Sequence, residues 1–114
     1  MSRGFDIHVE DGRETLAYLS KYRELAGKVK EIVKSVYPEA EVYIFGSVLS
    51  GKITALSDID ILIVSNNLSQ EENLKVKVEV LREIGFGAPI ELHFATQYQL
   101  KNWYRRFTVE MEKI

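Results

Sequence analysis

The chain contains 114 residues, of which 46% are hydrophobic and 28% are charged, with a formal net charge of −2. This composition is typical of a globular protein and predicts one domain over residues 1–114. The negative charge disfavours nucleic acid as a partner, because such binding usually needs a basic patch. The absence of cysteine excludes disulfides, cysteine-based zinc sites and a thiol nucleophile. Neither a run of 18 apolar residues nor a signal-peptide pattern is found, so we expect a cytoplasmic protein with no membrane partner.

A long amphipathic helix is predicted for residues 12–36. Apolar residues recur there at spacings of three, four or their sums, which places them on one side of a helix. Pro38 follows, as expected just beyond a helix end. The apolar positions are Leu16, Leu19, Leu25, Val29, Ile32 and Val36.

Residues 41–45 are predicted to form a strand that ends in a turn suited to phosphate. The run is rich in β-branched and aromatic residues, and it stops at Gly46, which tolerates unusual backbone angles. Gly46 lets a phosphate approach the backbone, while the Ser47 hydroxyl and nearby N–H groups can donate hydrogen bonds to it. Taken alone, a glycine–serine pair after a strand is usually only a turn.

A second predicted strand, residues 58–64, carries two carboxylates on one face. Strand side chains alternate, so Asp58 and Asp60 share a face and the isoleucines of this run occupy the other. Two carboxylates in an apolar strand repel each other and resist desolvation unless a cation, water or donors stabilise them. Mg²⁺ meets this need, because it prefers hard oxygen ligands together with substrate phosphates. Ser57 could donate to the same phosphates. A solvated or capping aspartate pair is the alternative reading of this motif.

The next predicted helix begins after Ser69 and ends near Gly85. Ser69 is a candidate N-cap, with a glutamate three positions later as in a capping box. Within the helix, Leu74, Val78 and Leu81 form an apolar stripe.

A third strand is predicted for residues 90–94, followed by a final helix over residues 97–113 with Thr96 as its cap. Apolar residues again fall on one broad side of this helix. The order of elements predicts a small α/β domain in which helices cover one face of a sheet and leave the metal face open. The residues expected on the apolar side of the last helix are Leu100, Trp103, Tyr104, Phe107 and Met111.

The two motifs together resemble the signature of a known superfamily. Phe45-Gly46-Ser47, a ten-residue spacer and Asp58-Ile59-Asp60-Ile61 match the pattern hG[GS] and Dh[DE]h of the DNA polymerase beta-like nucleotidyltransferases. The short chain looks most like the minimal nucleotidyltransferases of that superfamily, in their archaeal form, over about residues 42–94. The resemblance implies an α+β fold with a mixed sheet of three to four strands, helices on one face and the metal site on the other.

The resemblance also implies a third carboxylate on a later strand, and Glu91 stands at the matching place. The implied catalytic and metal-binding set is Asp58, Asp60 and Glu91, holding two Mg²⁺ ions, with Mn²⁺ as a substitute. Family members more often have aspartate at the third position. His93 shares the Glu91 face by strand alternation, so it could approach the site, and a structural role is its alternative.

One departure from the family concerns phosphate binding. Many relatives read Gly-Ser-Arg-x-Arg-Gly, whereas this chain has Val48-Leu49-Ser50 between Ser47 and the next glycine. Lys52 could supply a compensating charge to a triphosphate, although an ammonium lacks the bidentate fork of arginine. The implied phosphate-binding residues are therefore Gly46, Ser47, Ser57 and Lys52.

The function implied by the resemblance is transfer of a nucleoside monophosphate, with AMP from ATP as the first choice, to a hydroxyl acceptor. Minimal nucleotidyltransferases often act beside small helical HEPN-type proteins, as antitoxins that adenylylate a tyrosine of the toxin, so such a protein is the expected partner. The alternatives are a binding module that holds a helical partner without catalysis and a nucleotide sensor without turnover. A homodimer is also open, because a small domain with many aromatics can bury some between subunits.

Overall fold

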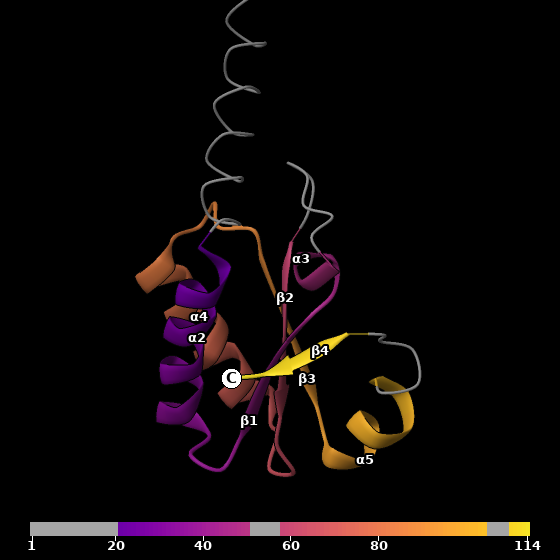
Figure 1. Cartoon of the computed structure of the whole chain (residues 1–114). Coiled ribbons are helices and arrows are strands. Elements are labelled where there is room, and N and C mark those ends of the chain that lie inside the picture. Colours follow the sequence, from indigo (N-terminus) through magenta and orange to yellow (C-terminus); the bar gives the residue numbers. More distant parts are fainter. Residues whose placement is uncertain (1–20, 51–57, 105–109) are drawn as a thin grey trace, which may run out of the picture.

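The computed structural model describes residues 21–50, 58–104 and 110–114. It contains helices, strands and one short π-helical turn, η1 (Figure 1). In chain order these elements are α2 (Tyr22–Val36), β1 (Glu41–Phe45), α3 (Ser47–Ser50), β2 (Ile59–Val64), α4 (Gln70–Ile84), β3 (Ile90–Ala95), α5 (Gln97–Gln99), η1 (Leu100–Tyr104) and β4 (Met111–Lys113).

The strands form one mixed four-stranded sheet in the order β3-β2-β1-β4. β1 is antiparallel to both of its neighbours, β2 and β4, and β2 is parallel to β3. The parallel pair is joined through α4, because a chain that continues in the same direction must return along the length of the sheet. The predicted mixed sheet with helices is confirmed.

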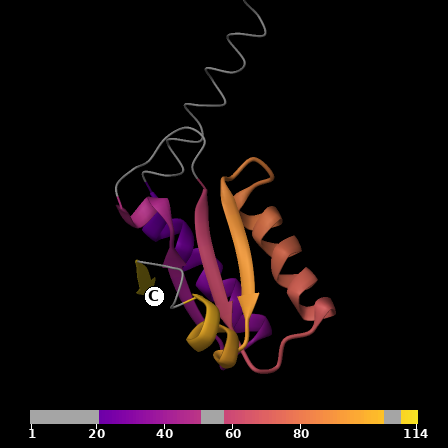
Figure 2. The same cartoon turned by 90° about the vertical axis from the view of Figure 1, so that its right-hand side faces the viewer.

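Helices α2 and α4 pack on one face of the sheet, and α5 with η1 lies on the other side (Figure 2). The isoleucines of β2 confirm the predicted alternation, since Ile59, Ile61 and Ile63 are fully buried against the α2 and α4 side. On the opposite face a smaller cluster contains Leu62 and Leu100. That face is therefore partly covered, and its polar part lies where β2 begins.

The predicted ends of α4 are confirmed. The Ser69 side chain accepts a hydrogen bond from the Glu72 backbone N–H, at 3.1 Å, and Gly85 is the C-cap. The first helix likewise ends at Val36, just before Pro38, while the part predicted for residues 12–20 lies outside the described residues. These helix ends are set by nearby residues that satisfy the unpaired backbone N–H and C=O groups or cannot continue the helix.

The apolar stripe predicted on α4 is not the side that packs against the sheet. Leu74, Val78 and Leu81 are 60%, 37% and 38% exposed, whereas Val76 and Val80 are buried.

Polar contacts from the C-cap residue of α2 support this orientation of α4. The Tyr37 hydroxyl donates to Asn73 Oδ1 at 2.6 Å and accepts from the Ser69 backbone N–H at 3.2 Å. Asn73 lies three and seven residues before Val76 and Val80, so all three share one helix face and turn toward α2 together.

The prediction of a helix as far as residue 113 is wrong at its end. Thr96 does cap a helical segment, in a capping box with Gln99, but Met111–Lys113 forms strand β4 on the free edge of β1. An unpaired edge of β1 would leave backbone N–H and C=O groups without partners, and β4 supplies them. Met111 packs in the smaller apolar cluster from this strand, while the predicted position of Phe107 lies outside the described residues.

No helix in the described part of the chain is both long enough and apolar enough to cross a membrane.

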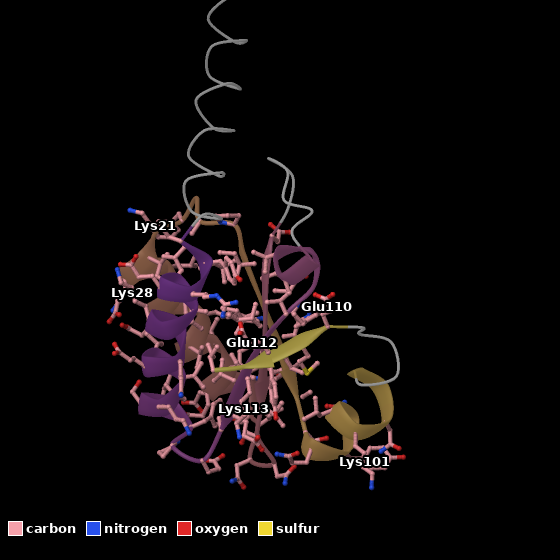
Figure 3. All side chains as sticks on the ribbon, viewed as in Figure 1. Lys21, Lys28, Lys101, Glu110, Glu112 and Lys113 are labelled. Atoms are coloured by element: carbon pink, nitrogen blue, oxygen red, sulfur yellow. The ribbon has the colours of Figure 1, made fainter. Side chains whose placement is uncertain are left out.

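The Glu41 carboxylate connects β1 to β4 and α5 at the edge of the sheet. Glu41 accepts hydrogen bonds from Tyr43 Oη at 2.9 Å and Gln97 Nε2 at 2.6 Å, and it forms an ion pair with Lys113 Nζ at 2.9 Å. Lys113 lies on β4, as Figure 3 shows. Hydrogen bonding to Lys113, Tyr43 and Gln97, in that order of effect, lowers the pKa of Glu41 to about 2.

We expect the Glu41→Gln variant to be less stable than the parent at pH 7, by at most about 1 kcal/mol because the group lies near the surface. The folded-state pKa is lower than the ordinary value of 4.5, so this contribution is present above about pH 4.5 and is lost as the pH falls toward 2. Thermal melts of both proteins between pH 7 and pH 2 check this. Glu31→Gln, an exposed change on α2, is the charge-matched control. A stability difference independent of pH would contradict the assignment.

Candidate functional site

Asp60, Glu91 and His93 gather on one face of the sheet. Asp60 and Glu91 are register partners on the parallel strands β2 and β3, and His93 follows Glu91 by two residues on the same face. His93 Nε2 lies 3.3 Å from Asp60 Oδ1 and 3.8 Å from Glu91 Oε1. One ligand atom from each residue lies within 4.8 Å of the others, so the group could hold one metal ion.

The three side chains differ in depth. Those of Asp60 and His93 are 22% and 27% exposed, whereas that of Glu91 is 57% exposed. The His93 ring packs against Phe45, with ring centroids 5.1 Å apart and planes at 60°. Phe45 is itself the register partner of Asp60 across the β1–β2 pair. The floor of the site is thus built by three adjacent strands, and Glu91 stands at its rim.

The charge of Asp60 is poorly compensated by protein groups. Burial raises the pKa of Asp60, and the negative charges of Glu91 and Asp58 raise it further. The hydrogen bond from His93 acts in the opposite direction but is outweighed. A bound cation would favour the ionised carboxylate, because opposite charge close to a buried group offsets its desolvation.

Gly46 lies directly against this carboxylate. It follows β1 with φ +90°, a left-handed backbone conformation that side chains rarely adopt. A Cβ atom added at Gly46 would lie 2.5 Å from Asp60 Oδ2, closer than such contacts allow. The chain then enters α3, and the Leu49 N–H donates to the Gly46 carbonyl at 3.2 Å. The glycine is required both by the turn and by the space that Asp60 occupies.

The structure brings some of the predicted site residues together and leaves others apart. Asp60 and Glu91 meet as predicted, while Asp58 precedes β2, is exposed and does not belong to the group of three. Ser47 is the first residue of α3. The predicted phosphate-binding roles of Ser57 and Lys52 fall on residues outside the described part of the chain.

His93 is a possible metal ligand whose role the sequence did not decide: both a role in the site and a structural role were open. The alternation of β3 correctly placed its side chain on the Glu91 face. Its short distance to Asp60 depends on the parallel pairing of β2 with β3. The order and direction of strands in a sheet cannot be read from the sequence alone.

The donor set fits a divalent cation. It offers two carboxylate oxygens, which are ligands of Mg²⁺ and Mn²⁺ in proteins, and an imidazole nitrogen, which is a ligand of first-row transition cations. The glycine beside Asp60 keeps the approach to its carboxylate free of a side chain.

A pair of glycine-to-alanine changes tests the role of Gly46. We expect Gly46→Ala to destabilise the protein by about 1–3 kcal/mol, because its backbone is left-handed and its Cβ would displace Asp60. Gly27→Ala is the matched control: it lies within α2 and its Cβ meets no atom within 4 Å, so it should stabilise by about 0.5–1 kcal/mol. Chemical denaturation measures both changes, and an unchanged or raised stability of Gly46→Ala would contradict the assigned contact.

Comparison with known proteins places the chain in a family. The family model for the nucleotidyltransferase domain matches residues 26–114. A curated protein of Methanocaldococcus jannaschii, named "Putative protein adenylyltransferase MJ1379", is 31% identical over 98 residues, which cover 84% of this chain and 95% of the relative.

Two solved structures have the same fold. A crystal structure described as that of a "putative nucleotidyltransferase" superposes with a TM-score of 0.63 at 31% identity, covering 77% of this chain and 95% of the other. A second, from Sulfolobus solfataricus, superposes with a TM-score of 0.52 at 23% identity, covering 93% and 82%, and supports the fold alone. The family-model match over residues 26–114 and the 31% identical relative lead to one assignment: this chain belongs to the nucleotidyltransferase domain family.

Proposed function

We propose that this protein is a metal-dependent nucleotidyltransferase that transfers AMP from ATP to a hydroxyl group. The observation that carries the proposal is the Asp60–Glu91 register pair beside the left-handed Gly46, in a chain of this family. The name of the Methanocaldococcus jannaschii relative, which refers to protein adenylylation, supports AMP as the transferred group and protein as the acceptor.

The acidic residues have distinct proposed roles. Asp60, partly buried, and Asp58, exposed just before β2, would hold Mg²⁺, which would neutralise charge on the triphosphate. Two bound Mg²⁺ ions, for which Mn²⁺ can substitute, would stabilise charge on the attacking and leaving oxygens of an in-line displacement. Glu91 stands at the exposed rim, where it can orient the attacking hydroxyl and accept its proton. No covalent bond to the protein is needed.

The turn after β1 is the proposed phosphate-binding segment. Gly46 allows close approach of phosphate to the backbone, and Ser47, Ser57 and Lys52 are the proposed donors. Val48, at one of the positions where many relatives have an arginine, is only 3% exposed and belongs to the main core. This position therefore contributes packing here, and we propose that the metal and Lys52 supply the positive charge for the triphosphate.

A tyrosine of a small helical HEPN-type protein is the proposed acceptor, which would make this chain an antitoxin. A single domain over residues 1–114, a cytoplasmic location and a homodimer stay predictions.

A second candidate function is partner binding or nucleotide sensing without catalysis. The absence of the familiar arginines at residues 48–50 is the observation that favours it. Retention of Asp60 and Glu91 at adjacent register positions argues for catalysis instead.

We expect Asp60→Asn to abolish Mg²⁺-dependent transfer while the protein stays folded. The raised pKa means that ionised Asp60 weakens folding as the pH rises through that pKa, so the metal-free variant should be at least as stable as the parent at pH 7. The assay is incubation with α-labelled ATP, Mg²⁺ or Mn²⁺ and a lysate of the source organism, followed by mass analysis of labelled material.

Glu83→Gln, an exposed change on α4, is the control for loss of one negative charge and should retain the label. Labelling by Asp60→Asn at the parent rate would overturn the proposed mechanism. A folded parent that captures a partner without labelling it would favour the binding module.

A further inference from the structure

The metal-binding group contains one ligand that does not suit Mg²⁺. Besides the oxygens of Asp60 and Glu91, it presents the imidazole nitrogen of His93. We propose that His93 is a direct metal ligand that shifts this site from Mg²⁺ toward first-row transition cations such as Mn²⁺ and Co²⁺. The inference rests on the proposed function, since it concerns the cation of the same site.

The distances around His93 fall within the range spanned by donors that share one ion. Donors bound at about 2.1 Å in octahedral geometry lie about 3.0 Å apart when adjacent and about 4.2 Å apart when opposite. His93 Nε2 is 3.3 Å from Asp60 Oδ1 and 3.8 Å from Glu91 Oε1. A histidine that only oriented Asp60 would need a single partner, whereas this nitrogen faces both carboxylates.

The imidazole is also held in place before any ion binds. The Phe45 ring packs against it at 5.1 Å, and β3 pairs in register with β2 beside it. Its side chain is 27% exposed, so part of it remains in contact with solvent. Little side-chain entropy is then lost when Nε2 becomes a ligand.

The nature of the donor decides which cations benefit. Mg²⁺ takes hard oxygen ligands and keeps several waters, so a neutral nitrogen adds little to its binding. Imidazole suits transition metals, and affinity for such sites rises from Mn²⁺ to Co²⁺ and beyond. The contribution of His93 should therefore be smallest for Mg²⁺, intermediate for Mn²⁺ and largest for Co²⁺.

The test replaces His93 by glutamine and measures binding rather than activity. Glutamine keeps a hydrogen-bond donor near the Nε2 position and offers a hard carbonyl oxygen in place of nitrogen. Isothermal titration of Mg²⁺, Mn²⁺ and Co²⁺ into tag-free protein gives the Co²⁺ to Mg²⁺ affinity ratio. We expect this ratio to fall at least about tenfold in His93→Gln, with Mg²⁺ affinity changed less than about threefold.

His8→Gln is the matched control, because His8 is the other of the two histidines in the chain. It should retain the parent ratio. In that variant His93 supplies the only imidazole signals, so a Zn²⁺-induced shift of its Nε2 resonance in ¹⁵N spectra reports ligation without any change at residue 93. This measurement keeps the inference testable even where His93→Gln folds poorly.

The outcomes separate this inference from the proposed function. An unchanged ratio in His93→Gln, or an unshifted Nε2 resonance at saturating Zn²⁺, overturns the inference and leaves the nucleotidyltransferase mechanism standing, provided that the parent binds Mg²⁺. If the parent binds none of these ions, with or without ATP, both the inference about His93 and the proposed metal-dependent function are overturned. Asp60→Asn should lose affinity for every ion, which confirms that the measured site is this one.

Discussion

Asp60 is a carboxylate held in a strand whose other residues are buried. Burial and the neighbouring charges of Glu91 and Asp58 make its ionised form costly, and the contact with His93 offsets only part of that cost. A chain selected for stability alone would have an apolar residue here, because all the remaining positions of β2 are apolar. The surrounding features are arranged around this group: a glycine beside its oxygen, an acidic register partner and an imidazole that faces both carboxylates.

The parallel pairing of β2 with β3 turns these separate residues into a site. Because the two strands run in the same direction and in register, Asp60 lies opposite Glu91, and the two-residue alternation then brings His93 to the same face. A slip of one residue would turn both β3 ligands toward α2 and α4. The buried isoleucines of β2 and the apolar residues of β3 that pack against the core prevent that slip. The same packing that stabilises the sheet therefore holds the ligands in position.

At the other edge of the sheet, β4 pairs with β1. β4 comes from the end of the chain, and an exposed ion pair between Arg23 of α2 and Glu112 connects it to the helical layer. Glu41 connects the same strand to α5. β1 therefore has partners on both sides, which fixes the strand that leads into Gly46 and so the turn beside Asp60.

The sequence by itself determined the features that depend on neighbouring residues. The strand at residues 41–45, the caps Ser69 and Gly85, and the position of Asp60 on the face opposite the isoleucines follow from local propensity, capping and period-two alternation. Glu91 was selected by the family resemblance rather than by local pattern. Only the tertiary structure decided which face of α4 is buried, that Met111–Lys113 is a strand, and that His93 joins the acidic group while Asp58 stays outside it. Each of these depends on contacts between segments far apart in the chain. The free energy of such contacts outweighs local conformational preference, and a short stretch of sequence does not reveal them.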